Sequence, residues 1–299
     1  MGKVIYVVGN EKNVGKTTVV KHLLQQMNNV CVTSIGFDGE ETDNITSLPK
    51  PLVRLKQNDF VITCERFLDA SHFLIIEAID ENPLAGAVFL AQCVLPTHVI
   101  IAGATPRAIE LATKKEYFET LIVDGALDRL VHAGFIDNAS IIFVIGVQQQ
   151  AEAELQRSIE RVLGAFQIPL APQPVIELLR NCNHVCGLRS TGILEKLSPS
   201  LLNNSIPDQE KYEWIFVPGV LLEETVRKFR QTKFCLSNPF SFFANPQKFD
   251  NIYTVKKLQL SRIYVNLFER PWYEEKVFKM VKSYGYEIFD ILRTDSQEG

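Results

Sequence analysis

Short apolar runs broken by polar turns dominate the first 168 residues, and most of them predict buried β-strands. The β-branched run 4–8 predicts the first strand, and good helix formers at 21–27 predict a helix soon after it. Thr105 and Pro106 are typical of a helix start, here extending to about Tyr117. Apolar residues at helical spacing predict a further helix at 151–166. The other predicted strands are 30–34, 99–103, 121–124 and 141–145, while the apolar runs 60–63, 73–79 and 87–94 each fit a strand or a short buried helix.

Strands that alternate with helices predict an α/β fold with a mostly parallel sheet flanked by helices. The runs between 50 and 94 lack a long amphipathic helix and contain a turn signal at 80–83, so they predict an antiparallel insertion. A proline-rich stretch at 168–174 predicts a boundary between domains 1–168 and 175–299. The second range is predicted to be another α/β unit or an extension of the same sheet. Its predicted elements are strand 214–217, helix 221–231, strands 234–236 and 262–267, helix 273–283 and strand 286–291.

The segment between the first strand and its helix is the main candidate site. Backbone N–H groups of such a loop and of the following helix N-terminus converge on an anion. Lys16 is predicted to reach the β- and γ-phosphates of ATP, and the Thr17 hydroxyl to ligate Mg²⁺. The plainer alternative is an ordinary strand–turn–helix with a chance Gly-Lys-Thr, but the strand–loop–helix context favours a nucleotide site. The predicted binding residues are Gly9, Asn10, Glu11, Lys12, Asn13, Val14, Gly15, Lys16, Thr17 and Thr18.

Three acidic residues at strand ends are candidates for the metal and the attacking water. Asp38 follows the second strand, where the carboxyl ends of α/β sheets line a ligand crevice, and the alternative is a solvated acidic turn. Asp124 closes an apolar strand and precedes Gly125, as in a Walker B segment that holds Mg²⁺; the alternative is a simple strand-end turn. Glu77 is a lower-ranked rival. Lys16, Asp38 and Asp124 are the predicted catalytic residues, with Thr17, Asp124 and Asp38 around the metal.

The glycine spacing of this loop resembles that of a known superfamily. The plain phosphate-binding pattern places its first glycine at position 10, where this chain has Asn10, and Gly9 lies one residue earlier. The longer loop resembles that of dethiobiotin synthetases, MinD/ParA-type ATPases and metal-cofactor accessory NTPases. The MinD-type resemblance implies a homodimer that sandwiches the nucleotide, although Glu11 stands where those proteins have a signature lysine, with Lys12 next to it.

A wider resemblance covers most of the chain. The segments 34–40, 123–129, 216–219 and 264–266 are similar to a family encoded beside B12-dependent lysine and ornithine aminomutases, whose members are regarded as reactivase subunits. That resemblance implies a partner enzyme.

The absence of an Asn-Lys-x-Asp motif after a late strand favours ATP over GTP.

The overall composition narrows the possible classes of protein further. With 299 residues, 46% hydrophobic residues and a net charge of −4, the chain has ample core and no basic stripe for nucleic acid or an anionic membrane. The N-terminus has no signal or membrane segment, so a cytoplasmic location is expected. Six cysteines do not indicate a disulfide framework, and Cys182, His184 and Cys186 lack a fourth ligand for zinc.

Two functional classes stay open. One is an NTPase switch whose nucleotide state changes its affinity for a partner protein, with the C-terminal half as the docking surface. The other is an ATP-dependent small-molecule ligase of the dethiobiotin synthetase type. Against the ligase, the segment after the second strand offers acids such as Asp38 where those enzymes carry a substrate-side lysine.

Overall fold

The chain forms two compact units. The computed structural model describes residues 2–35, 52–126, 136, 139–146, 152–197, 211–266 and 273–290. The first unit comprises Met1–Gln148, Leu260–Glu275 and Glu287–Gly299, and the second comprises Gln149–Gln259 and Lys276–Tyr286. This division differs from the predicted ranges 1–168 and 175–299, because the chain passes between the units four times, after Gln148, Gln259, Glu275 and Tyr286.

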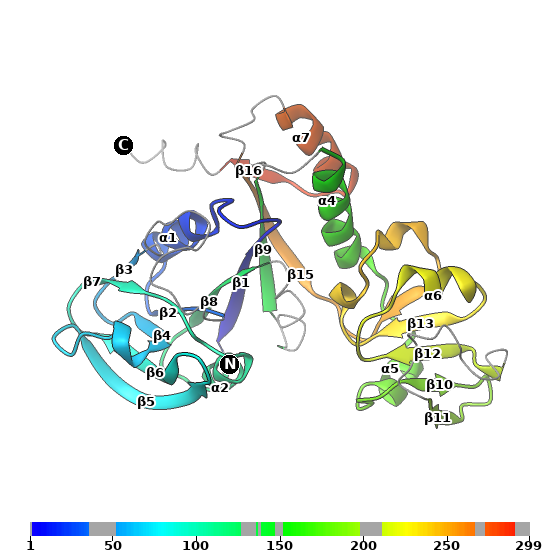
Figure 1. Cartoon of the computed structure of the whole chain (residues 1–299), viewed down its shortest axis with the longest axis horizontal. Coiled ribbons are helices and arrows are strands. Elements are labelled where there is room, and N and C mark those ends of the chain that lie inside the picture. Colours follow the sequence, from blue (N-terminus) through cyan, green and yellow to red (C-terminus); the bar gives the residue numbers. More distant parts are fainter. Residues whose placement is uncertain are drawn as a thin grey trace. The chain divides into compact units, whose positions relative to one another are not determined.

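A nine-stranded mixed sheet forms the first unit (Figure 1). Its strand order is β16-β15-β9-β1-β8-β2-β4-β6-β5. The pairs from β9 through β1, β8 and β2 to β4 are parallel, whereas β4, β6 and β5 pair antiparallel, as predicted for the insertion. The bounds are β1 (Lys3–Gly9), β2 (Val30–Ser34), β4 (Phe60–Cys64), β5 (Phe73–Asn82), β6 (Gly86–Cys93), β8 (Thr120–Ala126), β9 (Ala139–Gly146), β15 (Gln259–Asn266) and β16 (Ile288–Asp290).

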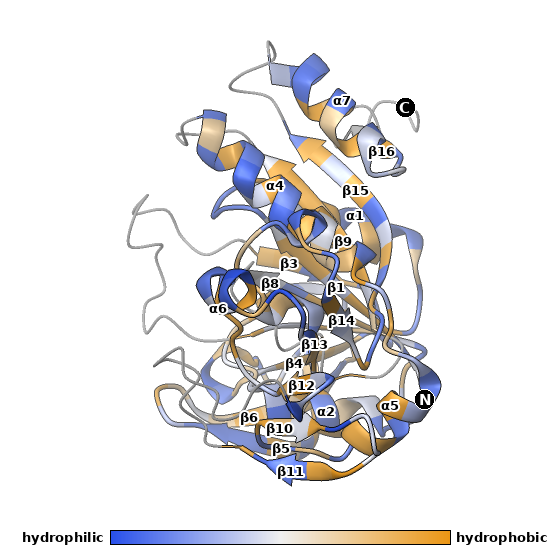
Figure 2. Ribbon diagram, turned by 90° about the vertical axis from the view of Figure 1, so that its right-hand side faces the viewer, coloured by the Kyte–Doolittle hydropathy of each residue, from blue (hydrophilic) through white to orange (hydrophobic). Residues whose placement is uncertain are grey.

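The central strands are buried along their whole length, which explains their continuous apolar runs. All eight residues of β9 are buried, and in β1 only Lys3 is exposed. Strands covered on both faces are expected to lose the polar alternation of a half-exposed sheet. Figure 2 shows β9 as a largely apolar ribbon, β15 as a strand of mixed polar and apolar residues, and α4 (Glu152–Gln167) as a helix with polar and apolar faces.

Among the described residues, two further α-helices and a small sheet belong to the first unit. Helix α1 (Lys16–Gln26) packs on β1, β8 and β3 (Leu52–Leu55), while α2 (Pro106–Thr113) packs on β5. Strand β3 pairs antiparallel with β7 (Thr97–Ile100) in a separate two-stranded sheet. Thr105 caps α2 as predicted, but the helix ends at Thr113 instead of near Tyr117. There the Thr113 hydroxyl donates to the Glu110 carbonyl at 2.7 Å, which offers the last turn an alternative to continued helix bonding.

The second unit is also α/β. Strands β12 (Trp214–Val217), β13 (Lys233–Leu236) and β14 (Ile252–Thr254) are parallel, and β10 (Cys186–Leu188) and β11 (Leu194–Lys196) extend the sheet antiparallel. Both predicted alternatives for the C-terminal half therefore occur, because β12–β14 build a second sheet whereas β15 and β16 extend the first one. The helices of this unit are α4, α5 (Gln173–Leu179), α6 (Glu223–Lys228) and most of α7 (Glu274–Ser283).

Most apolar side chains of α4 and of the aromatic cluster in the second unit are buried. In α4 the five apolar residues at helical spacing all face the interior. Within the aromatic cluster of the second unit, Phe234, Phe240 and Phe242 are buried and Phe249 is half-buried, but Phe243 is 53% exposed. Phe243 instead lies under the Arg161 guanidinium, 4.9 Å from its ring centre, which gives this exposed ring a polar neighbour.

Candidate functional site

The loop that follows β1 folds back closely onto the ends of two strands. A Cβ atom at Gly9 would lie 2.4 Å from Val14 Cγ2, and one at Gly146 would lie 2.5 Å from Val14 Cβ. Contacts under 3.0 Å do not occur between ordinary side chains, so both positions require glycine for this approach. The buried Val14 side chain thereby fixes the loop between the ends of β1 and β9.

Asn10 ties the same loop to β9. Its side chain is buried, and it donates from Nδ2 to the Gly146 carbonyl at 2.9 Å while its Oδ1 accepts from the Gly146 N–H at 2.8 Å. Its own N–H donates to the Val144 carbonyl at 3.2 Å. The amide of Asn10 thus continues the β1–β9 ladder for one more residue, which gives a structural reason for asparagine where the plain pattern has glycine.

The loop then turns sharply into α1. Asn13 and Gly15 have positive φ angles of 57° and 97°, a region that asparagine and glycine adopt at low cost. Gly15 is the N-cap residue, and no side chain caps the helix. Since the first N–H groups of a helix have no acceptor within it, the start of α1 at Lys16 carries the donors and the positive dipole end that favour an anion.

Lys16 lies across the loop. Its Nζ donates to the Glu11 carbonyl at 2.8 Å, and its Cγ and Cδ atoms come within 3.1 Å of the position that a Cβ at Gly9 would take. The side chain is half-buried. A cation is therefore held directly above the helix start, next to the end of β1.

Thr17 and Asp124 meet at the adjacent strand end. The Thr17 hydroxyl donates to Asp124 Oδ2 at 3.0 Å. Asp124 lies on β8, which pairs with β1 so that Asp124 is in register with Val7 and with Ser34 of β2. Its backbone carbonyl accepts the Ile35 N–H at 3.3 Å, which joins the end of β2 to the same point. The structure therefore brings two predicted metal ligands together from positions 107 residues apart.

The remaining predicted residues divide into three groups. Glu11 is half-buried beside Asn10, while Lys12, Asn13 and Thr18 are exposed. Asp38 lies outside the described residues. Glu77, the rival acid, lies on β5, four strands from β8, which corresponds to about 19 Å at the usual strand spacing. There Glu77 forms an ion pair with Lys115 at 2.7 Å.

Sequence reasoning missed two residues that shape the loop. Gly146 carries no motif of its own, although its place directly after an apolar strand was visible. Asn266, the last residue of β15, donates from Nδ2 to the Val14 carbonyl at 3.2 Å. No sequence signal connects Asn266 to a loop about 250 residues earlier, because only the order of strands in the sheet brings them together.

Other candidate chemistry is sparse in the described part of the chain. Among these residues, no group of three or more His, Cys, Asp or Glu side chains is arranged to hold a metal ion. The Cys186 thiol is buried, and burial raises its pKa to about 12. No helix among the described residues has both the length and the apolar character to cross a membrane.

Comparison with known proteins gives no independent assignment. No known protein-family profile matches the chain, and none of the curated protein sequences matches it either. The features that indicate a function are accordingly the loop between β1 and α1 and the Asp124 carboxylate beside it.

Proposed function

We propose that the chain is a P-loop NTPase that binds ATP with Mg²⁺ at residues 9–18 and acts as a nucleotide-dependent switch for a partner enzyme. The observation that carries the proposal is the hydrogen bond from Thr17 to Asp124 at 3.0 Å, next to an uncapped helix start and the Lys16 ammonium. Hydroxyl and carboxylate oxygens are the ligands that Mg²⁺ prefers, and an uncapped helix N-terminus favours phosphate.

The side chains around the loop suit Mg-ATP, and each has an expected role in binding it. Lys16 would exchange the Glu11 carbonyl for phosphate oxygens, which offer it a stronger, charge-assisted bond. Thr17 and Asp124 would hold the metal, which neutralises charge on the phosphates when it is bound. Asp38, three residues beyond Ile35, is the proposed residue for orienting the attacking water.

Chain connectivity supports a switch over a self-contained enzyme. Gly146 on β9 and Asn266 on β15 both contact the loop. Strand β9 ends two residues before the chain passes to the second unit, and β15 begins where the chain returns from it. A change in the loop therefore acts on the two strands that are covalently joined to the second unit. A nucleotide biases a partner only through a difference in affinity between its two states.

Calorimetric titration with Mg-ATP tests the site. Lys16→Ala should weaken binding about 100-fold, because charge-assisted hydrogen bonds contribute about 1.5–3 kcal/mol each. Lys12→Ala is the matched control, since Lys12 is an exposed lysine in the same loop, and it should bind as the wild type does. Equal affinities of Lys16→Ala and wild type would exclude the assignment. The same titration with GTP tests the expected preference for ATP.

Phosphate release separates the switch from the ligase. The protein alone should hydrolyse ATP slowly, and a partner should accelerate it and bind with different affinity in the ATP and ADP states. The sequence resemblance makes B12-dependent aminomutases the first partners to test, and a gel-filtration assay would also detect a nucleotide-dependent homodimer. Strong stimulation by one small carboxylic acid, with a phosphorylated or ligated product, would overturn the switch in favour of the ligase.

A further inference from the structure

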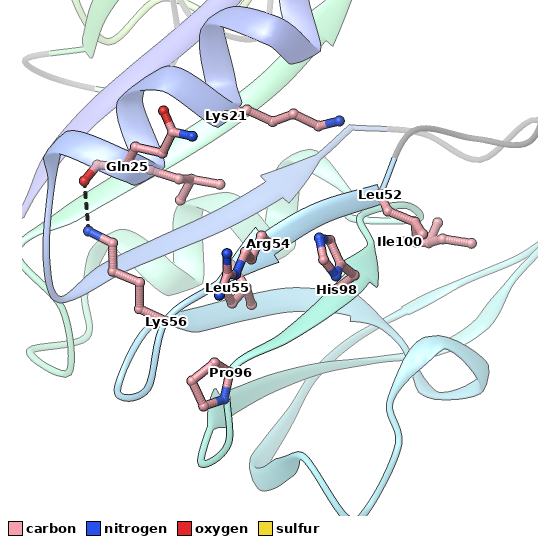
Figure 3. A pocket seen from close by; sticks show the side chains of 10 residues that line it. Lys21, Gln25, Leu52, Arg54, Leu55, Lys56, Pro96, His98 and Ile100 are labelled. Atoms are coloured by element: carbon pink, nitrogen blue, oxygen red, sulfur yellow. Dashed lines mark hydrogen bonds between the residues drawn. The ribbon is translucent and has the colours of Figure 1, made fainter. Parts of the chain in front are cut away.

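A groove lies along the flank of α1, in the half of the helix that does not carry the loop (Figure 3). Its volume is about 930 Å³, within the range of about 300–1,000 Å³ that small-molecule sites occupy. Leu24 lies eight residues after Lys16, which places this part of the helix about 12 Å from its start. The lining residues are Lys21, Leu24, Gln25, Leu52, Arg54, Leu55, Lys56, Pro96, His98 and Ile100.

The floor of the groove is apolar. Leu24 and Leu55 are buried, and the cross-strand pair Leu52 and Ile100 extends the same surface along the β3–β7 sheet. Leu52 nevertheless exposes 45% of its surface. An exposed apolar side chain in a hollow with a buried apolar floor favours a ligand with a hydrocarbon or aromatic body.

The rim of the groove is cationic. Lys21 and Arg54 are exposed, and neither has a hydrogen bond or ion pair within the described part of the chain. His98 lies directly opposite Arg54 in the antiparallel pairing, so the two side chains share one face of the sheet. Among the described residues that line the groove there is no aspartate or glutamate, so its described lining is basic and apolar.

Lys56 also lines the groove, but its role differs from that of Lys21 and Arg54. Its ammonium donates to the carbonyls of Gln25 and Met27 at 2.8 and 2.7 Å and to Asn28 Oδ1 at 3.2 Å. These bonds satisfy carbonyls at the C-terminal end of α1 and fix β3 to the helix. The charge available to a ligand therefore comes from Lys21 and Arg54.

We propose that this groove is a second binding site, and that it takes a small amphipathic anion with an apolar body and a single carboxylate head. The body would lie on Leu24, Leu52 and Ile100, and the carboxylate would pair with Arg54 and Lys21. A guanidinium presents two parallel N–H donors to a carboxylate, which suits one terminal head better than a chain of phosphates.

Octanoate, octanol and octylammonium form a probe set in which an unbranched alkyl body carries an anionic, a neutral and a cationic head, respectively. Titration calorimetry is done on the full chain without nucleotide, so the result is independent of the proposed function. Octanoate should bind at one site per chain, octanol at least about fivefold more weakly, and octylammonium not measurably. Equal binding of octanoate and octylammonium, or no octanoate binding at millimolar concentration, would overturn the proposal.

Two variants and two matched controls locate the site. Arg54→Gln should weaken octanoate about fivefold, and Leu52→Glu about tenfold or more, because the new carboxylate repels the head. Arg107→Gln, an exposed arginine on α2, and Leu74→Glu, an exposed leucine on β5, should leave binding unchanged.

Cross-linking gives a second measurement that does not depend on the variants. A diazirine analogue of octanoate should label peptides that contain residues 52–56 or 96–100. Labelling confined to other peptides, or octanoate affinity unaltered by Leu52→Glu, would contradict this location.

Discussion

The two candidate sites on α1, the loop at its start and the groove on the flank of its second half, are built in different ways. At its start, a contiguous loop packs against the ends of β1 and β9 with close contacts, and Asn10, Lys16 and Thr17 all hold specific hydrogen bonds. On its flank, the groove is assembled from residues 21–25, 52–56 and 96–100, and Arg54 and Lys21 stay without partners in the described chain. The first site is therefore rigid and sensitive to single atoms, while the second should tolerate substitution and discriminate mainly by charge.

The largest expected effect tests the rigidity of the loop. Gly146→Ala should lower the free energy of unfolding by about 3 kcal/mol and abolish nucleotide binding, because its Cβ would overlap Val14. Gly125→Ala is the matched control on β8, where the nearest atom would lie at an ordinary 3.6 Å. Urea unfolding of both variants gives the comparison.

A double variant sharpens that result. Val14→Gly removes both the Cβ and the Cγ1 atoms that a Cβ at Gly146 would meet at 2.5 Å, so Val14→Gly with Gly146→Ala should be more stable than the sum of the two single effects predicts. Strict additivity would show that the close approach of Val14 to β9 does not decide the stability of the loop.

A smaller loss of stability is expected when the Asn10 side chain, which bonds both backbone groups of Gly146, is removed. Asn10→Ala leaves the N–H and carbonyl of Gly146 without their partner in a buried place and should cost about 2 kcal/mol in urea unfolding. Asn28→Ala is the control just beyond the other end of α1, where the exposed Asn28 side chain accepts a hydrogen bond of 3.2 Å from the Lys56 ammonium and should contribute a few tenths of a kcal/mol at most. Equal losses would contradict the difference between the two regions.

The Thr17 hydroxyl should matter only when the metal is present. Thr17→Val keeps the shape of the side chain but removes the oxygen that bonds Asp124, so the gain in ATP affinity on adding Mg²⁺ should fall about fivefold, which corresponds to about 1 kcal/mol. Thr18→Val, at the exposed neighbouring position, should leave that gain intact. Calorimetry with and without Mg²⁺ distinguishes the two, and an unchanged gain in Thr17→Val would remove this hydroxyl from the metal site.

The two sites also differ in how far the sequence reveals them. The order of apolar runs predicted β1, β2, β8 and β9, and the Gly-Lys-Thr spacing identified the loop, because these signals lie within about ten consecutive residues. The partnership of Thr17 with Asp124 was predicted from strand-end chemistry. Strand order was beyond sequence reasoning, since it depends on long-range pairing, and so the contacts of Gly146 and Asn266 with the loop were missed.

The groove was missed for the same reason. Leu52, Arg54 and His98 carry no motif, and the strand that contains Leu52 was not predicted at all. Only the antiparallel pairing of β3 with β7 places Arg54 opposite His98 and turns both towards α1. The C-terminal half was predicted as an α/β unit or as a sheet extension, and the chain uses both because β15 and β16 return to the first sheet.

The smallest expected effect concerns Asp59, a buried carboxylate next to the groove. It accepts the Lys56 N–H at 2.9 Å and the Val30 N–H at 3.4 Å, and so joins the end of β3 to β2. Burial raises the pKa of Asp59 above its usual 3.8, and the two backbone N–H bonds only partly offset that. Between 3.8 and the raised pKa, the folded chain holds a proton that the unfolded chain has released, so stability falls as pH rises through this window. Relative to Asp59→Asn, the wild type should therefore lose stability as pH increases from below 3.8, and a flat difference would contradict the shift.

Asp69 provides the control of opposite sign. It is exposed, and hydrogen bonds from the Ser71 N–H and hydroxyl hold its pKa below 3.8. Its contribution is present above pH 3.8 and is lost as pH falls through the lowered pKa, because protonation then breaks the favourable bonds. Urea unfolding across this acid range should thus give opposite slopes for wild type against Asp59→Asn and for wild type against Asp69→Asn. Slopes of the same sign would mean that burial does not set the charge state of Asp59, and that the junction of β3 with β2 is as open to water as the Asp69 turn.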